Sequence, residues 1–83
     1  MRITVRYFAS LREALGSSAT VDAEASATLA DLRDELIASS PAHAAALARG
    51  RAVRCAIDQT MCDESALLRD GCEVAFFPPV TGG

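Results

Sequence analysis

The pattern of hydrophobic and polar positions predicts a strand at the start of the chain, over residues 2–8. Apolar side chains at Ile3, Val5 and Tyr7 alternate with polar ones. This period of two is typical of a half-buried strand. Phe8 is the exception, because it places a large aromatic ring on the polar face. From this pattern alone, Phe8 either covers the end of the sheet or marks a partner surface, and neither interpretation is favoured.

The longest predicted helix follows Thr28. Thr28 and Asp31 resemble a capping box, and the apolar residues between positions 29 and 37 follow the spacing of one buried helical stripe. Pro41 ends this helix, because the residue before a proline disfavours the helical conformation. Shorter helices are predicted at 10–15, with Ser10 as N-cap and Gly16 as its stop, and at 42–48, with His43 at its exposed start.

Further strands complete the predicted order of elements, at 19–23, 53–57, 60–62 and 73–77. The order is strand, strand, helix, strand, short strand, strand. This order predicts an α+β roll, in which one main helix covers one face of a mixed sheet. A chain of 83 residues makes one domain. We divide it into a body, 1–77, and an extended C-terminal tail, 78–83.

Composition narrows the class of function. All eight basic residues are Arg, and 11 acidic residues give a net charge of −3. This balance argues against binding to nucleic acid and against a polybasic membrane anchor. No apolar stretch approaches the roughly 20 residues of a spanning helix. Charges interrupt the apolar residues at the N-terminus, so this segment is not a signal peptide. We therefore expect a cytoplasmic protein with no membrane partner.

The cysteines do not predict a disulfide framework or a metal site. Cys55, Cys62 and Cys72 are odd in number and lack a Cys-x-x-Cys spacing, and His43 is the only histidine. We expect three reduced thiols and no bound metal. Cys72 follows Gly71 in a turn, where its thiol could be exposed.

The clusters of charged residues within the chain are predicted to lie on the solvent-exposed surface. Arg49, Arg51 and Arg54 form the only basic cluster, and a solvated loop is favoured there over contact with an acidic partner. The carboxylate pairs at 34–35 and 63–64 are sequence neighbours and also indicate solvated surface rather than acid–base chemistry.

The C-terminal tail carries the candidate chemistry. Pro78 and Pro79 fix an extended path after the last strand. Gly82 and Gly83 have no Cβ, so the end of the backbone can enter a narrow channel in another protein. The α-carboxylate of Gly83 is a poor electrophile and needs activation, for instance as an acyl-adenylate made with ATP. The chain has no phosphate-binding loop, so an activating partner must supply that site.

Residues 70–83, Asp-Gly-Cys-Glu-Val-Ala-Phe-Phe-Pro-Pro-Val-Thr-Gly-Gly, resemble the C-terminal signature of the MoaD family. Members are small subunits of molybdopterin synthase and sulfur carriers with a ubiquitin-like β-grasp fold. The resemblance extends over essentially the whole chain, including 7–13 and 56–59. Cys72 stands where the family often has Asp, and Asp58 where it often has Asn. These two departures bear on turn geometry and not on the reactive end.

The resemblance implies a carrier that is not catalytic alone and binds no cofactor itself. A MoeB-type enzyme adenylates Gly83 with ATP and Mg²⁺, and a sulfur donor system converts the adenylate to a thiocarboxylate. The chain docks on a MoaE-type large subunit in a heterotetramer. The tail then enters the large subunit's active site and gives its sulfur to precursor Z, forming the molybdopterin dithiolene.

The resemblance also assigns roles to individual residues. Gly83 carries the sulfur. The inserted tail comprises Pro78, Pro79, Val80, Thr81 and Gly82. The apolar contacts with the large subunit are Phe8, Met61 and Phe77, which favours the partner-surface interpretation of Phe8.

Three alternatives stay open on the sequence. The first is a sulfur carrier for another pathway, either ThiS-like or tRNA-thiolating, although ThiS-like chains are typically shorter and lack Phe-Phe-Pro-Pro. The second is a ubiquitin-like modifier that joins its Gly-Gly end to a lysine. Because the chain has no Lys, it could act only as a donor. The third is a β-grasp interaction module with an inert tail.

Overall fold

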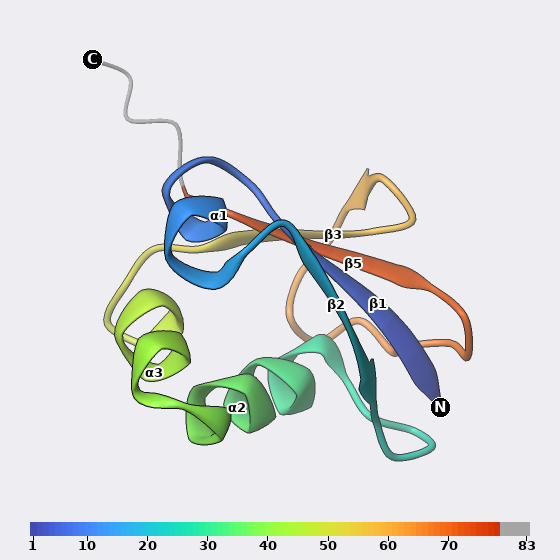
Figure 1. Ribbon diagram of the computed structural model, residues 1–83. Coiled ribbons are helices and arrows are strands. Elements are labelled where there is room, and N and C mark those ends of the chain that lie inside the picture. Colours follow the sequence, from blue (N-terminus) through green and yellow to red (C-terminus); the bar gives the residue numbers. More distant parts are fainter. Residues whose placement is uncertain (79–83) are drawn as a thin grey trace.

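Five strands form one mixed sheet in the computed structural model, which describes residues 1–78 of the chain. The elements in chain order are β1 (Arg2–Tyr7), α1 (Ala9–Leu15), β2 (Ser18–Asp22), α2 (Leu29–Ser39), α3 (Pro41–Leu47), β3 (Arg54–Ile57), β4 (Thr60–Met61) and β5 (Glu73–Phe77). The strand order is β2-β1-β5-β3-β4 (Figure 1). β1 and β5 are parallel, and the other neighbouring strands are antiparallel. Each predicted strand is present within one residue of its predicted bounds.

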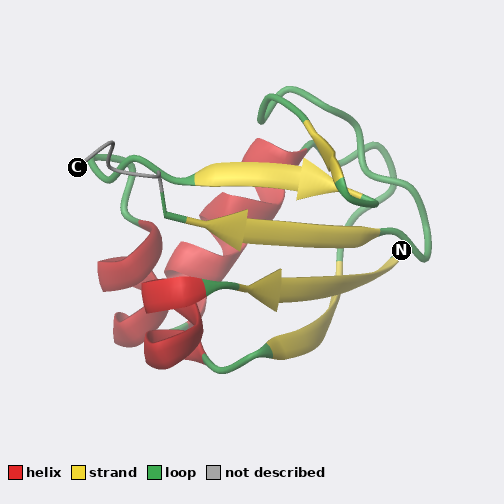
Figure 2. Cartoon of the chain, turned by 90° about the horizontal axis from the view of Figure 1, so that it is seen from above, coloured by secondary structure: helices red, strands yellow, loops and turns green. Residues whose placement is uncertain are grey.

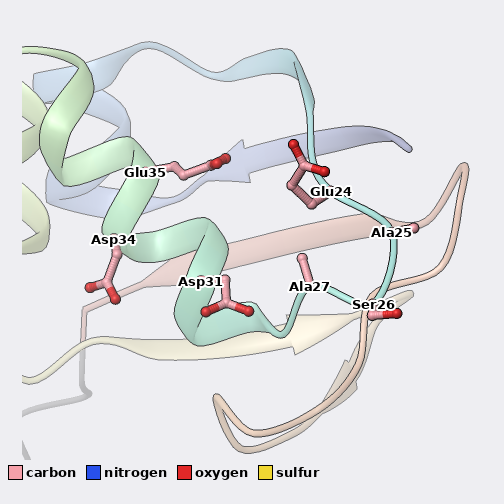
Figure 3. Close-up of a pocket in the computed structure, with 7 residues that line it drawn as sticks. All are labelled: Glu24, Ala25, Ser26, Ala27, Asp31, Asp34 and Glu35. Atoms are coloured by element: carbon pink, nitrogen blue, oxygen red, sulfur yellow. The ribbon is translucent and has the colours of Figure 1, made fainter.

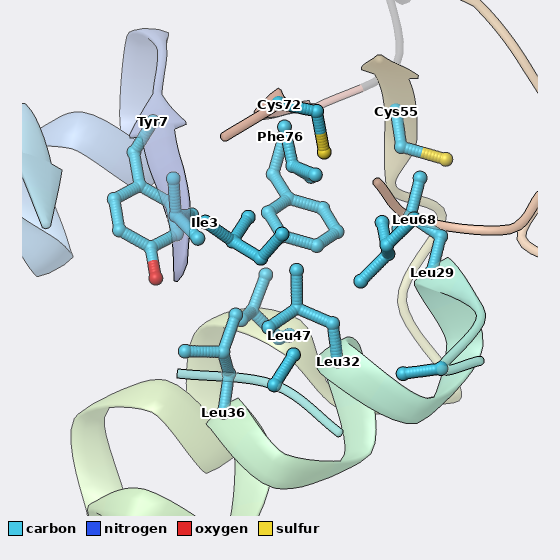
Figure 4. Packing of buried hydrophobic residues seen from close by; sticks show 14 of the residues in the cluster. Ile3, Tyr7, Leu29, Leu32, Leu36, Leu47, Cys55, Leu68, Cys72 and Phe76 are labelled. Carbon is cyan, nitrogen blue, oxygen red and sulfur yellow. The ribbon is translucent and has the colours of Figure 1, made fainter. Parts of the chain in front are cut away.

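Helices α2 and α3 cover one face of this sheet (Figure 2). Leu32 of α2 and Leu47 of α3 are fully buried against Val5 and Phe76 of the central strands. Figure 4 shows how the leucines meet the aromatic rings. The predicted main helix is therefore α2, and α3 shares the helical layer with it. Among residues 1–78, no helix is both long enough and apolar enough to cross a membrane.

The N-terminus of α2 is held by the predicted capping box. The Asp31 backbone N–H donates to Thr28 Oγ1 at 3.2 Å, and the Thr28 N–H donates to Asp31 Oδ2 at 2.9 Å. These bonds satisfy amides that the first helical turn leaves without partners. Local sequence therefore sets this boundary.

Helix α1 begins differently from the prediction, because Phe8 and not Ser10 occupies the N-cap. The Phe8 N–H donates to the Phe76 carbonyl at 3.1 Å, and this bond holds Phe8 extended beside β5. The chain then turns at Ala9, which has a φ of 53°. Gly16 ends the helix with a φ of 91°, as predicted.

His43 is partly buried and not exposed, which corrects the prediction for α3. Ser40 is the N-cap and accepts a hydrogen bond from the His43 N–H at 3.1 Å. The imidazole Nδ1 lies 2.6 Å from Ser40 Oγ, and the ring packs edge-on to Tyr7 with 6.2 Å between centroids. These contacts draw the imidazole towards the core.

Cys72 is also buried, contrary to the expectation that its thiol could be exposed. Only 3% of the residue is accessible. Gly71 makes the turn with a φ of 81°, and the Thr4 N–H then donates to the Cys72 carbonyl at 3.1 Å. This bond fixes Cys72 beside β1, where its thiol joins the core cluster.

Arg33 is the one charged side chain buried within residues 1–78, with 3% of the residue accessible. Its guanidinium donates to the carbonyls of Leu47, Ala48 and Arg51 and to Glu64 Oε2 at 2.7 Å. A buried cation needs this number of acceptors, because desolvation is costly. Arg33 thereby ties α2 to the segment that leads into β3.

Candidate functional site

The face of the sheet opposite the helices carries an exposed aromatic pair. Tyr7 and Phe76 are register partners that face the core, so the residues that follow them, Phe8 and Phe77, face outward. The rings of Phe8 and Phe77 meet edge to face, with 6.2 Å between centroids. Phe8 is 37% exposed and Phe77 is half-buried. The structure thus brings together two of the three predicted docking residues.

Met61 extends this apolar surface across β3 to the edge strand β4. Ala75 is paired with Ala56, and Ala56 with Met61. Ala56 and Ala75 are both buried, with 4% and 9% of the residue accessible, but neither belongs to the core cluster, so their methyl groups point to the outer face between Phe77 and Met61. Met61 is 52% exposed. We call the surface formed by Phe8, Phe77, Ala75, Ala56 and Met61 the apolar strip.

The turn before β4 fixes the position of Met61. Asp58 and Gln59 both have positive φ, 48° and 70°, as a tight two-residue hairpin turn requires. Asp58 accepts hydrogen bonds from the Glu73 N–H at 2.9 Å and from Arg69 at 2.6 Å. The backbone bond from Glu73, followed by the bond from Arg69, lowers the pKa of Asp58. The carboxylate therefore anchors the hairpin to the start of β5.

The apolar strip adjoins the start of the tail. β5 lies between β1 and β3, and Phe77 is its last residue. Pro78 follows and lines a pocket with residues of α1, α3 and the segment before β3. The other predicted tail residues, Pro79, Val80, Thr81, Gly82 and Gly83, lie outside the described residues. A partner that covers Phe8 and Phe77 would thus meet the chain where the tail begins.

Two charged predictions are corrected by the structure. Arg49 does not sit in a simple solvated loop, because it donates to Asp34 at 2.7 Å and to Glu64. Glu64 is not simple solvated surface either, because it bridges Arg49 and the buried Arg33. Burial alone would raise the pKa of Glu64, but the hydrogen bonds from Arg49 and Arg33 outweigh it and hold the pKa below its usual value.

Sequence reasoning did not identify the Arg33–Glu64 pair. One signal was available: Arg33 follows Leu29 by four positions and so lies on the buried stripe of α2. The groups that accept hydrogen bonds from Arg33 could not be predicted from the helical pattern. They come from the end of α3, from the segment before β3 and from the connection after β4.

The acidic side chains gather away from the apolar strip. Glu24, Asp31, Asp34 and Glu35 line a pocket between α2 and the loop that precedes it (Figure 3). Asp31 is already engaged in the capping box and Asp34 with Arg49. No group of three or more His, Cys, Asp or Glu side chains within residues 1–78 is placed to hold a metal ion.

All three cysteines are free thiols, as predicted. Cys55 lies in the core, and its thiol is 3.5 Å from the Cys62 carbonyl. Burial, with smaller contributions from Cys62 and Glu64, raises the pKa of Cys55 to about 11. Such a thiol is almost entirely protonated at neutral pH and is a weak nucleophile.

The mixed sheet, with parallel β1 and β5 at its centre and α2 packed across it, defines a ubiquitin-like β-grasp domain. The chain belongs to the ThiS family, whose model matches residues 5–83. It is 44% identical over 81 residues to the molybdopterin synthase sulfur carrier subunit of Escherichia coli (strain K12), an alignment that covers 98% of this chain and 99% of the relative. The resemblance to the MoaD carriers is therefore confirmed.

Solved structures give the same picture. SAMP1 from Haloferax volcanii superposes with a TM-score of 0.80 at 28% identity, over 100% of both chains. A subunit in the complex of subunits 1 and 2 of molybdopterin-converting factor from Helicobacter pylori superposes with a TM-score of 0.70 at 25% identity, also over 100% of both chains. The predicted α+β, β-grasp fold is confirmed.

Proposed function

We propose that this chain is the sulfur carrier subunit of a molybdopterin synthase. The observation that carries the proposal is the alignment with the Escherichia coli carrier subunit, which extends over 98% of this chain at 44% identity. The apolar strip supports it, because a carrier needs a recognition surface close to the segment it delivers. Phe77 belongs to that strip and precedes Pro78 directly.

The chemistry resides in the α-carboxylate of Gly83. A MoeB-type enzyme would transfer AMP from ATP to this carboxylate with Mg²⁺, releasing pyrophosphate. A sulfur nucleophile from a donor system would then displace AMP and leave a thiocarboxylate. That group is ionised at neutral pH and is a better nucleophile than a carboxylate. It would attack precursor Z, and the sulfur would become part of the molybdopterin dithiolene.

The folded body would supply recognition and delivery. The apolar strip would dock on a MoaE-type large subunit, in a heterotetramer of two carriers and two large subunits. Pro78, Pro79, Val80 and Thr81 would lead Gly82 and Gly83 into the partner's active site.

Mass spectrometry tests the proposal directly. The protein is incubated with a MoeB-type enzyme, ATP, Mg²⁺ and a sulfur donor. We expect a species in which one oxygen of the C-terminal carboxylate has been replaced by sulfur. We also expect that species to form molybdopterin from precursor Z when the large subunit is added. If no thiocarboxylate forms under any donor, the carrier function is wrong.

Variants at the end of the chain provide the matched controls. Deleting Gly83, or adding one residue after it, should leave the thermal unfolding midpoint unchanged and abolish sulfur transfer. Molybdopterin formation at an unchanged rate in either variant would contradict the assignment of Gly83.

A second candidate function is a protein modifier that joins Gly83 to lysines of other proteins. The likeness to SAMP1, at a TM-score of 0.80, favours it, because a related structure is described as small archaeal modifier protein 1. The two functions differ in product. A modifier would leave the C-terminal peptide of this chain, through Gly83, attached to target lysines after proteolysis. A dedicated carrier would leave none.

A further inference from the structure

Two arginines flank the apolar strip at opposite corners. One row across the outer face of the sheet runs Arg6, Ala75, Ala56 and Met61, and the neighbouring row runs Phe8, Phe77 and Arg54. Arg6 borders the apolar residues of the first row on β1, with Ser18 of β2 beyond it, and Arg54 ends the second row on β3. β1 and β3 are separated only by β5, which gives about 10 Å across the sheet at roughly 4.8 Å per strand spacing. The two rows are two residues apart along the strands, roughly 7 Å, so the two positions lie about 12 Å apart.

Arg6 is held against the strip by its aromatic neighbour. Its guanidinium lies over the Phe8 ring, 5.3 Å from the centroid. Its nearest acid is Glu73, at 4.0 Å, where the side chains are 46% and 32% exposed. An ion pair of this length and exposure neutralises little charge. The guanidinium thus remains available to a partner while its position is fixed by Phe8.

Arg54 borders the other end of the strip. It is exposed, and it is the register partner of Phe77. It lines a pocket together with Met61, Asp63 and Glu64. Within residues 1–78 it forms no ion pair, whereas Arg33, Arg49 and Arg69 all bind carboxylates at 2.7 Å or less. A cation beside an apolar surface is the arrangement found at the rim of many protein interfaces.

These arginines are not part of a generally basic surface. The chain has a net charge of −3, and four carboxylates gather around α2 at the pocket shown in Figure 3. Leu29, Leu32 and Leu36 of α2 belong to the core cluster, so α2 packs on the face of the sheet opposite the apolar strip. This acidic pocket therefore lies away from the apolar strip.

We propose that Arg6 and Arg54 are the charged specificity determinants of the docking face, and that they pair with two carboxylates on the large subunit. These carboxylates would lie about 12 Å apart, on either side of the apolar area that covers Phe8 and Phe77. The inference rests on the proposed function, because it takes the large subunit as the occupant. Its physical effect is on orientation and on the rate of encounter, which complementary rim charges accelerate.

Charge reversal tests the inference. The variant Arg6→Glu/Arg54→Glu is mixed with the purified MoaE-type large subunit in a stopped-flow experiment at low salt. We expect the association rate constant to fall about tenfold, and its dependence on salt concentration to be lost or reversed. The control is Arg2→Glu, which reverses one charge on the same strand as Arg6 but away from the apolar strip, and it is expected to bind almost like wild type. If the double variant associates like wild type at every salt concentration, the inference is wrong.

The neutral variant Arg6→Leu/Arg54→Leu keeps the inference testable if charge reversal impairs folding. It should associate more slowly than wild type at low salt and at a similar rate at high salt. If the association rate of this variant stayed below that of wild type at high salt as well, the inference would be contradicted, because the decrease would reflect packing rather than charge. The inference would also be contradicted if the variant were adenylated more slowly by the MoeB-type enzyme but bound the large subunit as wild type does.

Failure of the inference can be distinguished from failure of the proposed function. If wild-type protein does not bind the large subunit, the proposed function is contradicted as well. If wild type binds, Phe8→Asp weakens binding and both arginine variants bind normally, only the role of Arg6 and Arg54 is contradicted.

Discussion

The ring of Phe8 stands nearly perpendicular to that of Phe77, at an interplanar angle of 80° and a centroid distance of 6.2 Å. The two residues are far apart in the sequence, and the parallel pairing of β1 with β5 brings them together. Edge-to-face aromatic pairs are mutually stabilising. Each ring therefore supports the other on the exposed face, and this rigidity suits a docking surface.

Phe8→Asp should weaken binding to the large subunit. Large aromatic residues at the centre of an interface commonly contribute 2 kcal/mol or more, so we expect Kd to rise by about thirtyfold or more. Isothermal titration calorimetry measures the change. Leu67→Asp is the matched control, because Leu67 is 64% exposed and lies outside the apolar strip. If Phe8→Asp and wild type bound the large subunit with equal affinity, Phe8 would have no role in docking and would only cover the end of the sheet.

Arg33→Leu should destabilise the fold strongly. The change leaves the carbonyls of Leu47 and Ala48 without their donor and Glu64 without its buried partner. We expect the free energy of unfolding to fall by about 3 kcal/mol, as for other broken buried ion pairs. Urea unfolding followed by circular dichroism measures it. Arg12→Leu, at an exposed position of α1, should change the stability by less than about 0.5 kcal/mol.

Glu64 should make stability depend on pH in the acid range. Its folded-state pKa is lowered, so its contribution is present above the unfolded-state pKa and is lost as pH falls through the folded-state pKa. Glu64→Gln should therefore be less stable than wild type at about pH 7, and the unfolding free energies of the two proteins should converge towards about pH 3. Urea unfolding at a series of pH values tests this.

A second carboxylate variant serves as the control for the pH series. Glu13 is exposed and forms no ion pair within residues 1–78. Glu13→Gln should follow the wild-type curve at each pH. Parallel curves for Glu64→Gln and wild type down to acid pH would contradict the role given to Glu64.

The three thiols should react at different rates in the folded protein. Cys62 is partly exposed, whereas Cys55 and Cys72 are 5% and 3% accessible. With a thiol reagent at neutral pH we expect one fast equivalent, which Cys62→Ser removes. Cys55 should stay slow until the pH approaches its pKa of about 11 or the protein unfolds. Three equal fast rates under native conditions would show that Cys55 and Cys72 are not protected.

Some features of this protein follow from the sequence because their causes are local. Alternation in residues 2–8 predicted which face of β1 is buried, since side chains alternate along any strand. The Thr28–Asp31 capping box lies within four residues, and Gly16 ended α1 through its own backbone freedom. The C-terminal residues 70–83 were sufficient to reveal the resemblance to the sulfur carriers, which the sequence comparisons then confirmed.

Other features were decided only by tertiary structure. Ser10 has the residue type of an N-cap, but the bond from Phe8 to Phe76 places Phe8 there instead. Cys72 follows a glycine turn, but its backbone bond to Thr4 draws it into the core. In each case a backbone hydrogen bond between segments distant in sequence outweighs a local preference.

The arginines show most clearly which features local sequence sets and which depend on tertiary structure. Eight arginines look alike in the sequence, yet the fold buries Arg33 among carbonyls, pairs Arg49 with two carboxylates and leaves Arg6 and Arg54 beside an apolar strip. The sequence by itself determined the secondary structure and the family, because patterns of neighbouring residues encode both. Only the tertiary structure decided which cations are buried and which lie beside the apolar strip, because the acceptors and neighbours of each arginine come from other elements of the chain.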